Sequence, residues 1–199
     1  MPDLPPDTPS PIDTAKRELR ARLRHRRDQF VAHINPRHRA LMFGVAPSPL
    51  RALLAEHRII GAYAAVGAEA DILTMLAASL GAGQCLALPC FTARDTPMLF
   101  RSWSPGDALE TGPYKVPQPR ADAAPVTPDL LMMPLLGFDR ALNRIGQGGG
   151  HYDRYCAAHP QAVRVGIAWD VQEIDLVPTE ATDVPLNAIL TQNEWISAA

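Results

Sequence analysis

The sequence has few cysteines and no long hydrophobic run, and both shortages exclude classes of protein. Cys85, Cys90 and Cys156 form neither a CxxC pair nor a disulfide framework, so we expect free, mostly buried thiols in a reducing compartment. No apolar run reaches about 18 residues, and no charged-then-apolar leader opens the chain. We therefore expect a cytoplasmic protein without a membrane span.

An excess of charge of either sign is also missing. The net charge is −2 over 199 residues, which gives no bulk attraction to nucleic acid. An apolar content of 47% supports a sizeable core, and the length favours one domain. We expect the proline-rich residues 1–12 to form a disordered tail and residues 13–199 to form a single domain.

The common nucleotide-binding fingerprints are absent. No GxxxxGK[ST] motif occurs, and the glycine-rich stretch from Arg144 to Arg154 fails the GxGxxG pattern because it ends in His151. What is present is RIGQGGGHYDR, with glycines at 146, 148, 149 and 150. Glycines allow close backbone approach, and free amides before a helix attract anions. This segment predicts a phosphate-binding loop; a flexible surface turn is the alternative.

Helical and strand-like patterns alternate along the chain. We expect helices over residues 13–34, 37–57 (with a break near Pro47), 71–80 and 152–158, and strands over residues 58–65, 84–88, 97–103, 129–134, 163–169 and 188–190. Residues 104–128 are rich in Pro, Gly and Asp and predict a long connection. This alternation predicts an α/β fold: a mostly parallel sheet flanked by helices, Rossmann-like and three-layered, with ligands at the carboxyl ends of the strands.

The predicted first helix is basic. It carries Lys16, Arg17, Arg20, Arg22, Arg24, Arg26 and Arg27 against Glu18 and Asp28. A solvated charged face is the plain interpretation, and a nucleic-acid arm is a weaker alternative because no aromatic side chain interleaves the charges. Lys16 and Arg20 are four residues apart and share one face. Two cations so placed can clamp a polyphosphate.

Four carboxylates are candidates for binding roles. Glu69 and Asp71 follow the 58–65 strand, where they either stabilise a helix start or accept hydrogen bonds from a polar substrate. Asp153 and Asp183 are candidates for holding Mg²⁺ beside phosphates. Asp183 also suits a turn before Pro185.

Aromatic and histidine side chains offer surfaces for a flat heterocycle. The candidates are Tyr63, Trp103, His151 and Tyr152. Core packing is the alternative for Tyr63 and Trp103. His151 is also a candidate acid or base, although no partner is evident in the sequence.

Taken together, these segments resemble the 5-formyltetrahydrofolate cyclo-ligase (5,10-methenyltetrahydrofolate synthetase) family. Residues 133–139 and 143–154 carry the resemblance; residues 15–20, 69–71 and 116–119 support it in order and spacing. It extends over nearly all of residues 15–190. It implies an enzyme that uses ATP and Mg²⁺ to convert 5-formyltetrahydrofolate into 5,10-methenyltetrahydrofolate, releasing ADP and phosphate. By the same analogy, the formyl oxygen attacks the γ-phosphate, N10 closes the ring and phosphate leaves.

The resemblance also implies residue roles. It places ATP contacts at Lys16, Arg20, Arg144, Gly146, Gln147, Gly148, Gly149, Gly150, His151 and Tyr152, magnesium ligands at Asp153 and Asp183, and folate contacts at Tyr63, Glu69 and His151. Arg144 and Asp153 are the catalytic candidates. The substrate is a small molecule, and we expect no nucleic-acid, membrane or obligate protein partner.

The chain departs from the family pattern at three positions. His151 replaces one ring of a usual aromatic pair, Gln147 stands where Tyr or a basic residue is common, and Leu142 stands where glycine is frequent. A noncatalytic paralogue that binds nucleotide or folate is therefore the alternative function. A sugar-phosphate isomerase on a similar sheet would not explain the basic helix or two metal carboxylates.

Overall fold

The computed structural model describes residues 11–93, 96–113 and 115–198. The helices in these residues are α1 (Pro11–His33), α2 (Pro36–Met42), α3 (Ser48–Glu56), α4 (Leu73–Ser79), α5 (His151–Ala158) and a 3₁₀ turn, η1 (Asp170–Gln172). The strands are β1 (Ile59–Gly61), β2 (Cys85–Cys90), β3 (Leu99–Trp103), β4 (Leu109–Thr111), β5 (Pro117–Pro119), β6 (Pro125–Val126), β7 (Leu130–Pro134), β8 (Gly137–Phe138), β9 (Arg144–Ile145), β10 (Val163–Ile167), β11 (Ala188–Leu190) and β12 (Trp195–Ser197).

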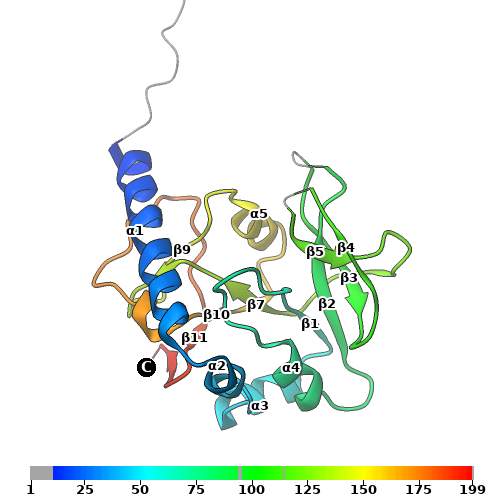
Figure 1. The fold of residues 1–199 in the computed structure, drawn as a ribbon. Helices are drawn as coiled ribbons and strands as arrows, with labels where there is room; N and C mark the ends of the chain where they lie inside the picture. Colours follow the sequence, from blue (N-terminus) through cyan, green and yellow to red (C-terminus); the bar gives the residue numbers. More distant parts are fainter. Residues whose placement is uncertain (1–10, 94–95, 114, 199) are drawn as a thin grey trace, which may run out of the picture.

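An eight-stranded sheet organises the molecule, in the order β12-β11-β10-β7-β1-β2-β3-β6. The strands from β11 to β2 pair in parallel, whereas β12, β3 and β6 add antiparallel edges. Connections between parallel strands place helices on the sheet faces. The predicted mostly parallel α/β fold is confirmed, and the sheet runs through the middle of the ribbon (Figure 1).

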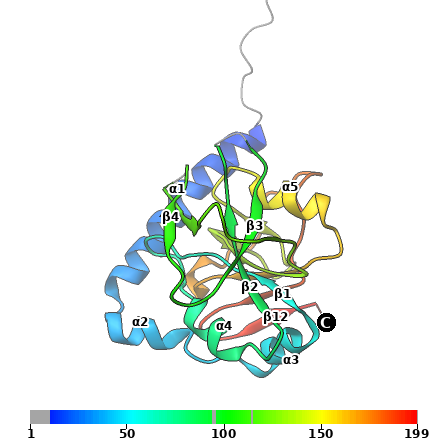
Figure 2. The ribbon, with the colours of Figure 1, turned by 90° about the vertical axis from the view of Figure 1, so that its right-hand side faces the viewer.

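The central strand β7 shows how the sequence builds two packed layers. Leu130 and Met132 belong to one apolar cluster, which includes side chains of α3 and α4. Leu131 and Met133 point into the other cluster, with Tyr155 of α5. Alternate residues of a strand face opposite sides of a sheet, so the apolar run fills both layers. Viewed from the side, α5 lies apart from α3 and α4, as expected for opposite faces (Figure 2).

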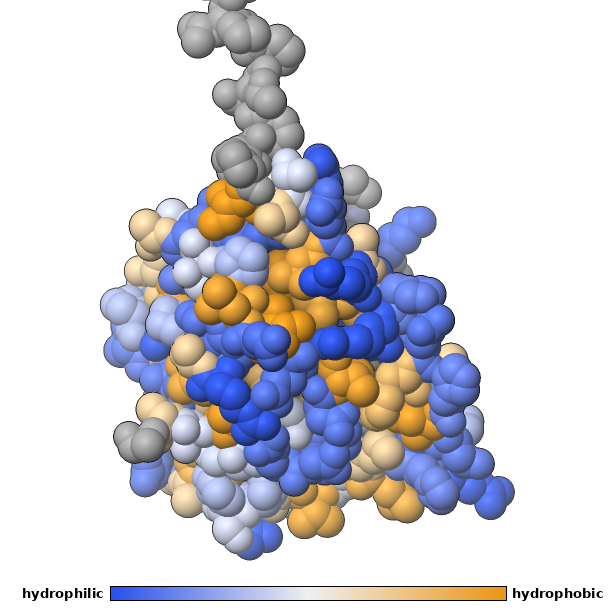
Figure 3. Space-filling view, turned by 90° about the vertical axis from the view of Figure 1, so that its left-hand side faces the viewer, coloured by the Kyte–Doolittle hydropathy of each residue, from blue (hydrophilic) through white to orange (hydrophobic). Residues whose placement is uncertain are grey.

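The basic helix α1 packs along one side of the sheet rather than standing free (Figure 1). Leu19 and Leu23 are buried against Leu136 and Ile145, next to the predicted phosphate loop. The face of the molecule on which α1 lies shows hydrophilic surface beside hydrophobic patches (Figure 3). None of the described helices is both long and apolar enough to span a membrane.

Several element bounds differ from the prediction. The helix predicted to start at residue 13 begins at Pro11, where proline is tolerated in the first turn; residues 1–10 of the predicted tail lie outside the described residues. The strand predicted over 58–65 is shorter and ends at Gly61; the Ala62 amide still donates to the Ala87 carbonyl of β2, and the apolar residues that follow are buried in the core.

The long connection predicted over 104–128 includes short strands that the sequence did not indicate. It contains β4, β5 and β6, which pair at the margins of the sheets. Its prolines concealed these strands, since proline is accepted in edge strands where no ladder donor is needed.

Candidate functional site

The glycine segment joins the β8–β9 hairpin to α5, at the carboxyl edge of the sheet. Gly148 (φ +104°) and Gly150 (φ +62°) adopt left-handed backbone conformations that favour glycine. Gly150 caps α5 without a side-chain hydrogen bond. Across the described parts of the chain, no hydrogen bond occupies the amides of Gly148, Gly149 and Gly150. The segment therefore presents donors at a helix start, as an anion site requires.

Two arginines hold this segment by its carbonyl groups. Arg20 Nε donates to the Gly146 carbonyl at 3.1 Å, and Arg154 Nη2 donates to the Gly149 carbonyl at 2.8 Å. Both arginines therefore contact carbonyl oxygens of the segment and leave its backbone amides unoccupied. Arg20, an expected ATP contact, thus lies beside the glycine segment, and its contact with ATP stays a prediction.

Lys16 lies one turn before Arg20 and is buried. Its Nζ is 2.6 Å from both Glu180 Oε2 and Asp183 Oδ2. Burial opposes the charged form, but the hydrogen bonds and charges of Asp183 and Glu180 outweigh it and raise the pKa of Lys16. The ammonium therefore stays protonated at neutral pH, where it is paired with the two carboxylates.

The second predicted magnesium ligand, Asp153, is paired with Arg144. Arg144 Nη2 donates to Asp153 Oδ1 at 2.5 Å, and the arginine side chain is only 5% exposed. The Nε atom of Arg144 is buried, and none of the described residues gives it a hydrogen-bond partner. A buried guanidinium with an unpaired donor lowers the stability of the fold. Such groups are typical of ligand-binding sites, where the ligand supplies the missing acceptor.

The two aspartates thus each contact a separate cation. Among the described residues no group of three His, Cys, Asp or Glu side chains is arranged to hold a metal ion. Mg²⁺ commonly uses one or two carboxylates together with substrate phosphates and water. The donor set of Asp153 and Asp183 fits a metal that arrives with a nucleotide, not a preformed protein cage.

Glu69 lies in the loop that follows β1 and reaches the glycine segment. Its Oε2 accepts from the Val66 amide at 3.0 Å, and its Oε1 accepts from Gln147 Nε2 at 3.4 Å. Arg24 of α1 donates to the other end of the same Gln147 side chain at 3.0 Å. Gln147 therefore links α1, the glycine segment and the Glu69 loop.

Burial is the main influence on the Glu69 carboxyl. It raises the pKa of Glu69, while the Val66 amide, Arg27 and Gln147 act in the opposite direction. Perturbed carboxyl groups in clefts are candidates for function. Glu69, and not Asp71, contacts the glycine segment; Asp71 instead accepts from the Leu73 amide at the start of α4.

Two tyrosines lie beside Glu69. The Tyr63 hydroxyl donates to the Ala70 carbonyl at 2.5 Å and its ring is buried, as core packing would require. The buried Tyr152 hydroxyl has no hydrogen-bond partner in residues 11–93, 96–113 and 115–198. Burial, then the charge of Glu69, raises the pKa of Tyr152, so its hydroxyl remains protonated. Trp103 packs against the same apolar cluster as Tyr63, and its Nε1 donates to the Asp107 carbonyl rather than to Glu69 or the glycine segment.

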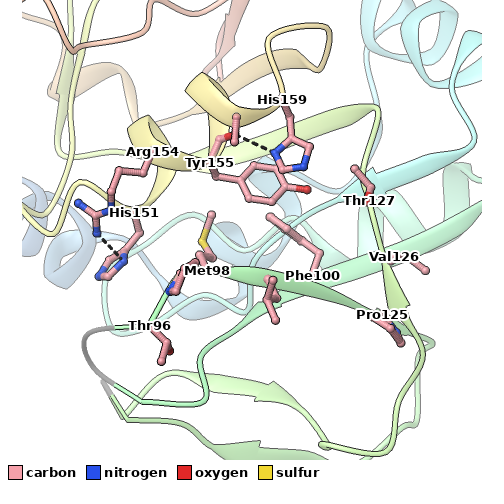
Figure 4. Close-up of a pocket in the computed structure, with 13 residues that line it drawn as sticks. Thr96, Met98, Phe100, Pro125, Val126, Thr127, His151, Arg154, Tyr155 and His159 are labelled. Carbon is pink, nitrogen blue, oxygen red and sulfur yellow. Dashed lines mark hydrogen bonds between the residues drawn. The ribbon is translucent and has the colours of Figure 1, made fainter.

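His151 borders a cavity of about 720 Å³ between α5 and strands β3 and β6 (Figure 4). The side chains of Met98, Phe100 and Tyr155 line it, and His151 and Arg154 lie at one end. His151 stacks edge-on against Phe91, with ring centroids 4.8 Å apart. Burial, followed by the nearby Arg154, lowers the pKa of His151, so the ring is neutral at neutral pH.

The structure explains two of the three departures noted in the sequence. Leu142, with φ +67°, adopts the conformation that glycine would adopt, and its side chain is buried at 7% exposure. Gln147 replaces a charged or aromatic contact with the Arg24–Glu69 link described above.

Sequence reasoning missed three residues of this site: Arg24, Arg27 and Glu180. The basic pattern of α1 pointed to the helix without showing which cations face inward. Glu180 sits three residues before Asp183 on a loop whose path the sequence does not predict. Only the fold brings residue 180 to residue 16.

A mostly parallel sheet flanked by helices, with a glycine segment at its carboxyl edge, places the chain in the class of α/β proteins. The sequence model of the 5-formyltetrahydrofolate cyclo-ligase family matches residues 12–192. The chain belongs to the 5-formyltetrahydrofolate cyclo-ligase family.

Individual relatives agree with this assignment. The 5-formyltetrahydrofolate cyclo-ligase of Mycolicibacterium smegmatis is 31% identical over 71% of this chain and 77% of that protein. The Escherichia coli protein of that name is 36% identical over 49% of this chain, and the match spans only 59% of the relative's length. A solved 5,10-methenyltetrahydrofolate synthetase from Aquifex aeolicus has a TM-score of 0.71 at 21% identity, covering 92% of each chain. This last likeness shows the shared fold.

Proposed function

We propose that this protein is an ATP-dependent 5-formyltetrahydrofolate cyclo-ligase that produces 5,10-methenyltetrahydrofolate, ADP and phosphate. One observation carries the proposal: the free amides of Gly148, Gly149 and Gly150 lie in one loop that contacts α1 and Glu69. Family membership over residues 12–192 supports the choice of reaction.

The phosphate side of the site suits a triphosphate. Lys16 and Arg20 approach from α1, and Arg144 approaches from the hairpin. Phosphoryl transfer depends on positioning and charge neutralisation more than on a protein nucleophile. These cations and the loop amides would hold the γ-phosphate in line with the formyl oxygen. Mg²⁺, bound with Asp153 and Asp183, would supply further charge neutralisation.

The Glu69 side of the site suits a pterin ring. An ionised carboxylate accepts hydrogen bonds, and the amino-pyrimidinone edge of a pterin offers N–H donors. Tyr152 contributes an unused hydroxyl beside this carboxylate. The apolar cavity that begins at His151 offers room for the aromatic portion of the folate outside the pterin.

In the reaction the formyl oxygen attacks the γ-phosphorus and ADP leaves with the bridging oxygen. N10 of the folate then adds to the activated formyl carbon, and phosphate departs as the five-membered ring closes. N10 releases its proton in forming the methenyl product. The protein residues bind and orient both substrates, and no side chain forms a covalent bond.

An absorbance assay for methenyl-folate formation, run with and without ATP and Mg²⁺, tests the proposal. We expect product only when both are present. The alternative, a noncatalytic paralogue, predicts ligand binding without product under any of these conditions.

Glu69→Ala tests the folate half of the site. The KM for 5-formyltetrahydrofolate should rise by about tenfold or more, since a charged hydrogen-bond acceptor is lost, while the KM for ATP should change little. Asp71→Ala is the control, because this neighbouring carboxylate serves the start of α4. Equal losses for both ligands would reject the folate role of Glu69.

A further inference from the structure

Arg27 of α1 is a buried cation beside the candidate site, and the proposed reaction assigns it no role. Its side chain is 7% exposed, and its Nε and Nη2 atoms donate to Asp28 Oδ1 at 3.3 Å. The third nitrogen, Nη1, is buried, has no hydrogen-bond partner among the residues that the structure describes, and lies 3.9 Å from Glu69 Oε1. Burying a guanidinium with an unused donor costs stability, so its position calls for an explanation.

The geometry separates Arg27 from the direct ligands of Glu69. A distance of 3.9 Å is beyond hydrogen-bonding range, so Arg27 acts on the carboxylate through charge. The direct donors to Glu69 are the Val66 amide and the Gln147 side chain. Both carboxylate oxygens keep lone pairs that can accept from a ligand.

The surroundings of Glu69 make this charge important. Its side chain is 13% exposed. Tyr63, two residues after β1, and Tyr152 of α5 are neutral hydroxyls on which the charge of Glu69 acts, and Asp71 also acts on Tyr63. Arg27 is the guanidinium whose charge acts on Glu69, whereas Arg24 reaches it only through Gln147.

We propose that Arg27 is a positioning residue that keeps Glu69 ionised, so that the carboxylate accepts hydrogen bonds from the donor edge of the pterin ring. A protonated carboxyl would present an O–H donor to that edge and lose an acceptor. This inference rests on the proposed function and extends it to the pH range in which the enzyme binds folate.

Removing the charge should make folate binding depend on pH. Burial raises the pKa of Glu69 and the charge of Arg27 opposes this rise, so without Arg27 the pKa would rise further. Protonation would then weaken binding as the pH falls toward that value. At higher pH the carboxyl ionises again, and affinity should recover.

The experiment measures the Kd of 5-formyltetrahydrofolate by calorimetry without nucleotide, from about pH 5.5 to about pH 8.5, a range that spans the expected shift. In Arg27→Met we expect binding to weaken by about tenfold near neutral pH, since an adjacent opposite charge typically shifts a pKa by 1–3 units. The loss should grow as the pH falls. Arg27→Lys should preserve most of the affinity and the flat profile.

Arg22→Met is the matched control, because Arg22 is an exposed cation on the same helix. It should bind folate like the wild type at every pH. The Glu69→Gln background provides a second check: there Arg27→Met should add no pH dependence, because the titrating group is gone.

The inference is overturned if Arg27→Met shows the wild-type profile, or if its loss is independent of pH, as a merely structural role predicts. Should Arg27→Met fail to fold, Arg27→Gln must show the same pH-dependent loss, and a flat profile in that variant rejects the proposal equally. Failure of the proposed function would differ: the wild-type chain would bind no 5-formyltetrahydrofolate at any pH.

Discussion

Arg140 and Arg144 stand four residues apart in one hairpin and have opposite environments. Arg140 is 56% exposed, and its guanidinium makes hydrogen bonds to both Glu173 and Glu194. Arg144 is 5% exposed and pairs with Asp153, and within the described part of the chain its Nε has no hydrogen-bond partner. All three guanidinium nitrogens of the exposed arginine donate hydrogen bonds, whereas the Nε of the buried arginine donates none to the described residues.

The difference in burial and hydrogen bonding distinguishes arginines in surface ion pairs from arginines in a candidate ligand site. Exposed ion pairs contribute little because water already solvates both partners. A buried and incompletely bonded cation destabilises the fold unless a ligand completes it. Arg27 and Arg144 belong to this buried, incompletely bonded group, whereas Lys16 is buried but paired with Glu180 and Asp183.

The largest effect on activity is expected from replacing the buried arginine, Arg144. Arg144→Ala should lower kcat by roughly 100- to 1000-fold, as loss of a preorganised charge at the reacting phosphate does in other enzymes. Arg140→Ala is the control and should stay within about twofold, because its pairs are exposed. Initial rates of methenyl-folate formation give both values. Wild-type rates in Arg144→Ala would reject its catalytic role.

The next largest effect is expected at the amides of the glycine segment. Two glycines with similar backbone angles, one inside the segment and one outside it, are compared. Gly148 (φ +104°) lies in the candidate phosphate loop, and Gly106 (φ +99°) lies in a turn before β4. Alanine should strain either turn by about 1–2 kcal/mol, measured by denaturant unfolding. Only Gly148→Ala should also raise the KM for ATP, by about tenfold, since one hydrogen bond to a charged group is worth about 1.5–3 kcal/mol.

Equal ATP constants for Gly148→Ala and the wild type, with the expected loss of stability present, would show that the loop does not grip the nucleotide. An ATP defect in Gly106→Ala would point instead to a general loss of structure.

A smaller effect is expected at α1. Lys16→Ala should raise the KM for ATP by about fivefold with a lesser change in kcat, because removing one phosphate contact costs about 1 kcal/mol. Arg17→Ala, an exposed neighbour on the same helix, should change neither constant. An unchanged KM in Lys16→Ala would remove Lys16 from the nucleotide site.

The smallest effect on activity is expected at the turn between Arg140 and Arg144. Leu142→Gly relieves a left-handed backbone but deletes a buried side chain. We expect a net loss of about 1–3 kcal/mol of stability, since the lost packing outweighs the relieved strain, with kcat unchanged. Urea unfolding compared with the assay separates the two; a stabilised Leu142→Gly would show that strain dominates.

The sequence predicted the sheet class because apolar runs separated by helical periodicity are local patterns. Leu130 to Met133 read as a buried strand in the sequence and alternate between the two packed layers in the structure. Strands such as β5 escaped prediction because prolines mask edge pairing.

The candidate site was predictable where its residues are close in sequence. The glycine segment and its flanking arginines fall within eleven residues. The contacts of Lys16 with Glu180, and of Gln147 with Glu69, join residues 164 and 78 positions apart. Which of several arginines on α1 faces inward depends on helix packing, so Arg27 could not be distinguished from Arg22 in the sequence.

The central claim is that the amides of Gly148, Gly149 and Gly150 grip the triphosphate of ATP. Amide NMR spectra recorded during a titration with MgATP test it directly. We predict that the three glycine resonances shift with saturation and that Arg144→Ala weakens the response. Stationary resonances at these glycines, with the largest shifts elsewhere in the molecule, would contradict the account.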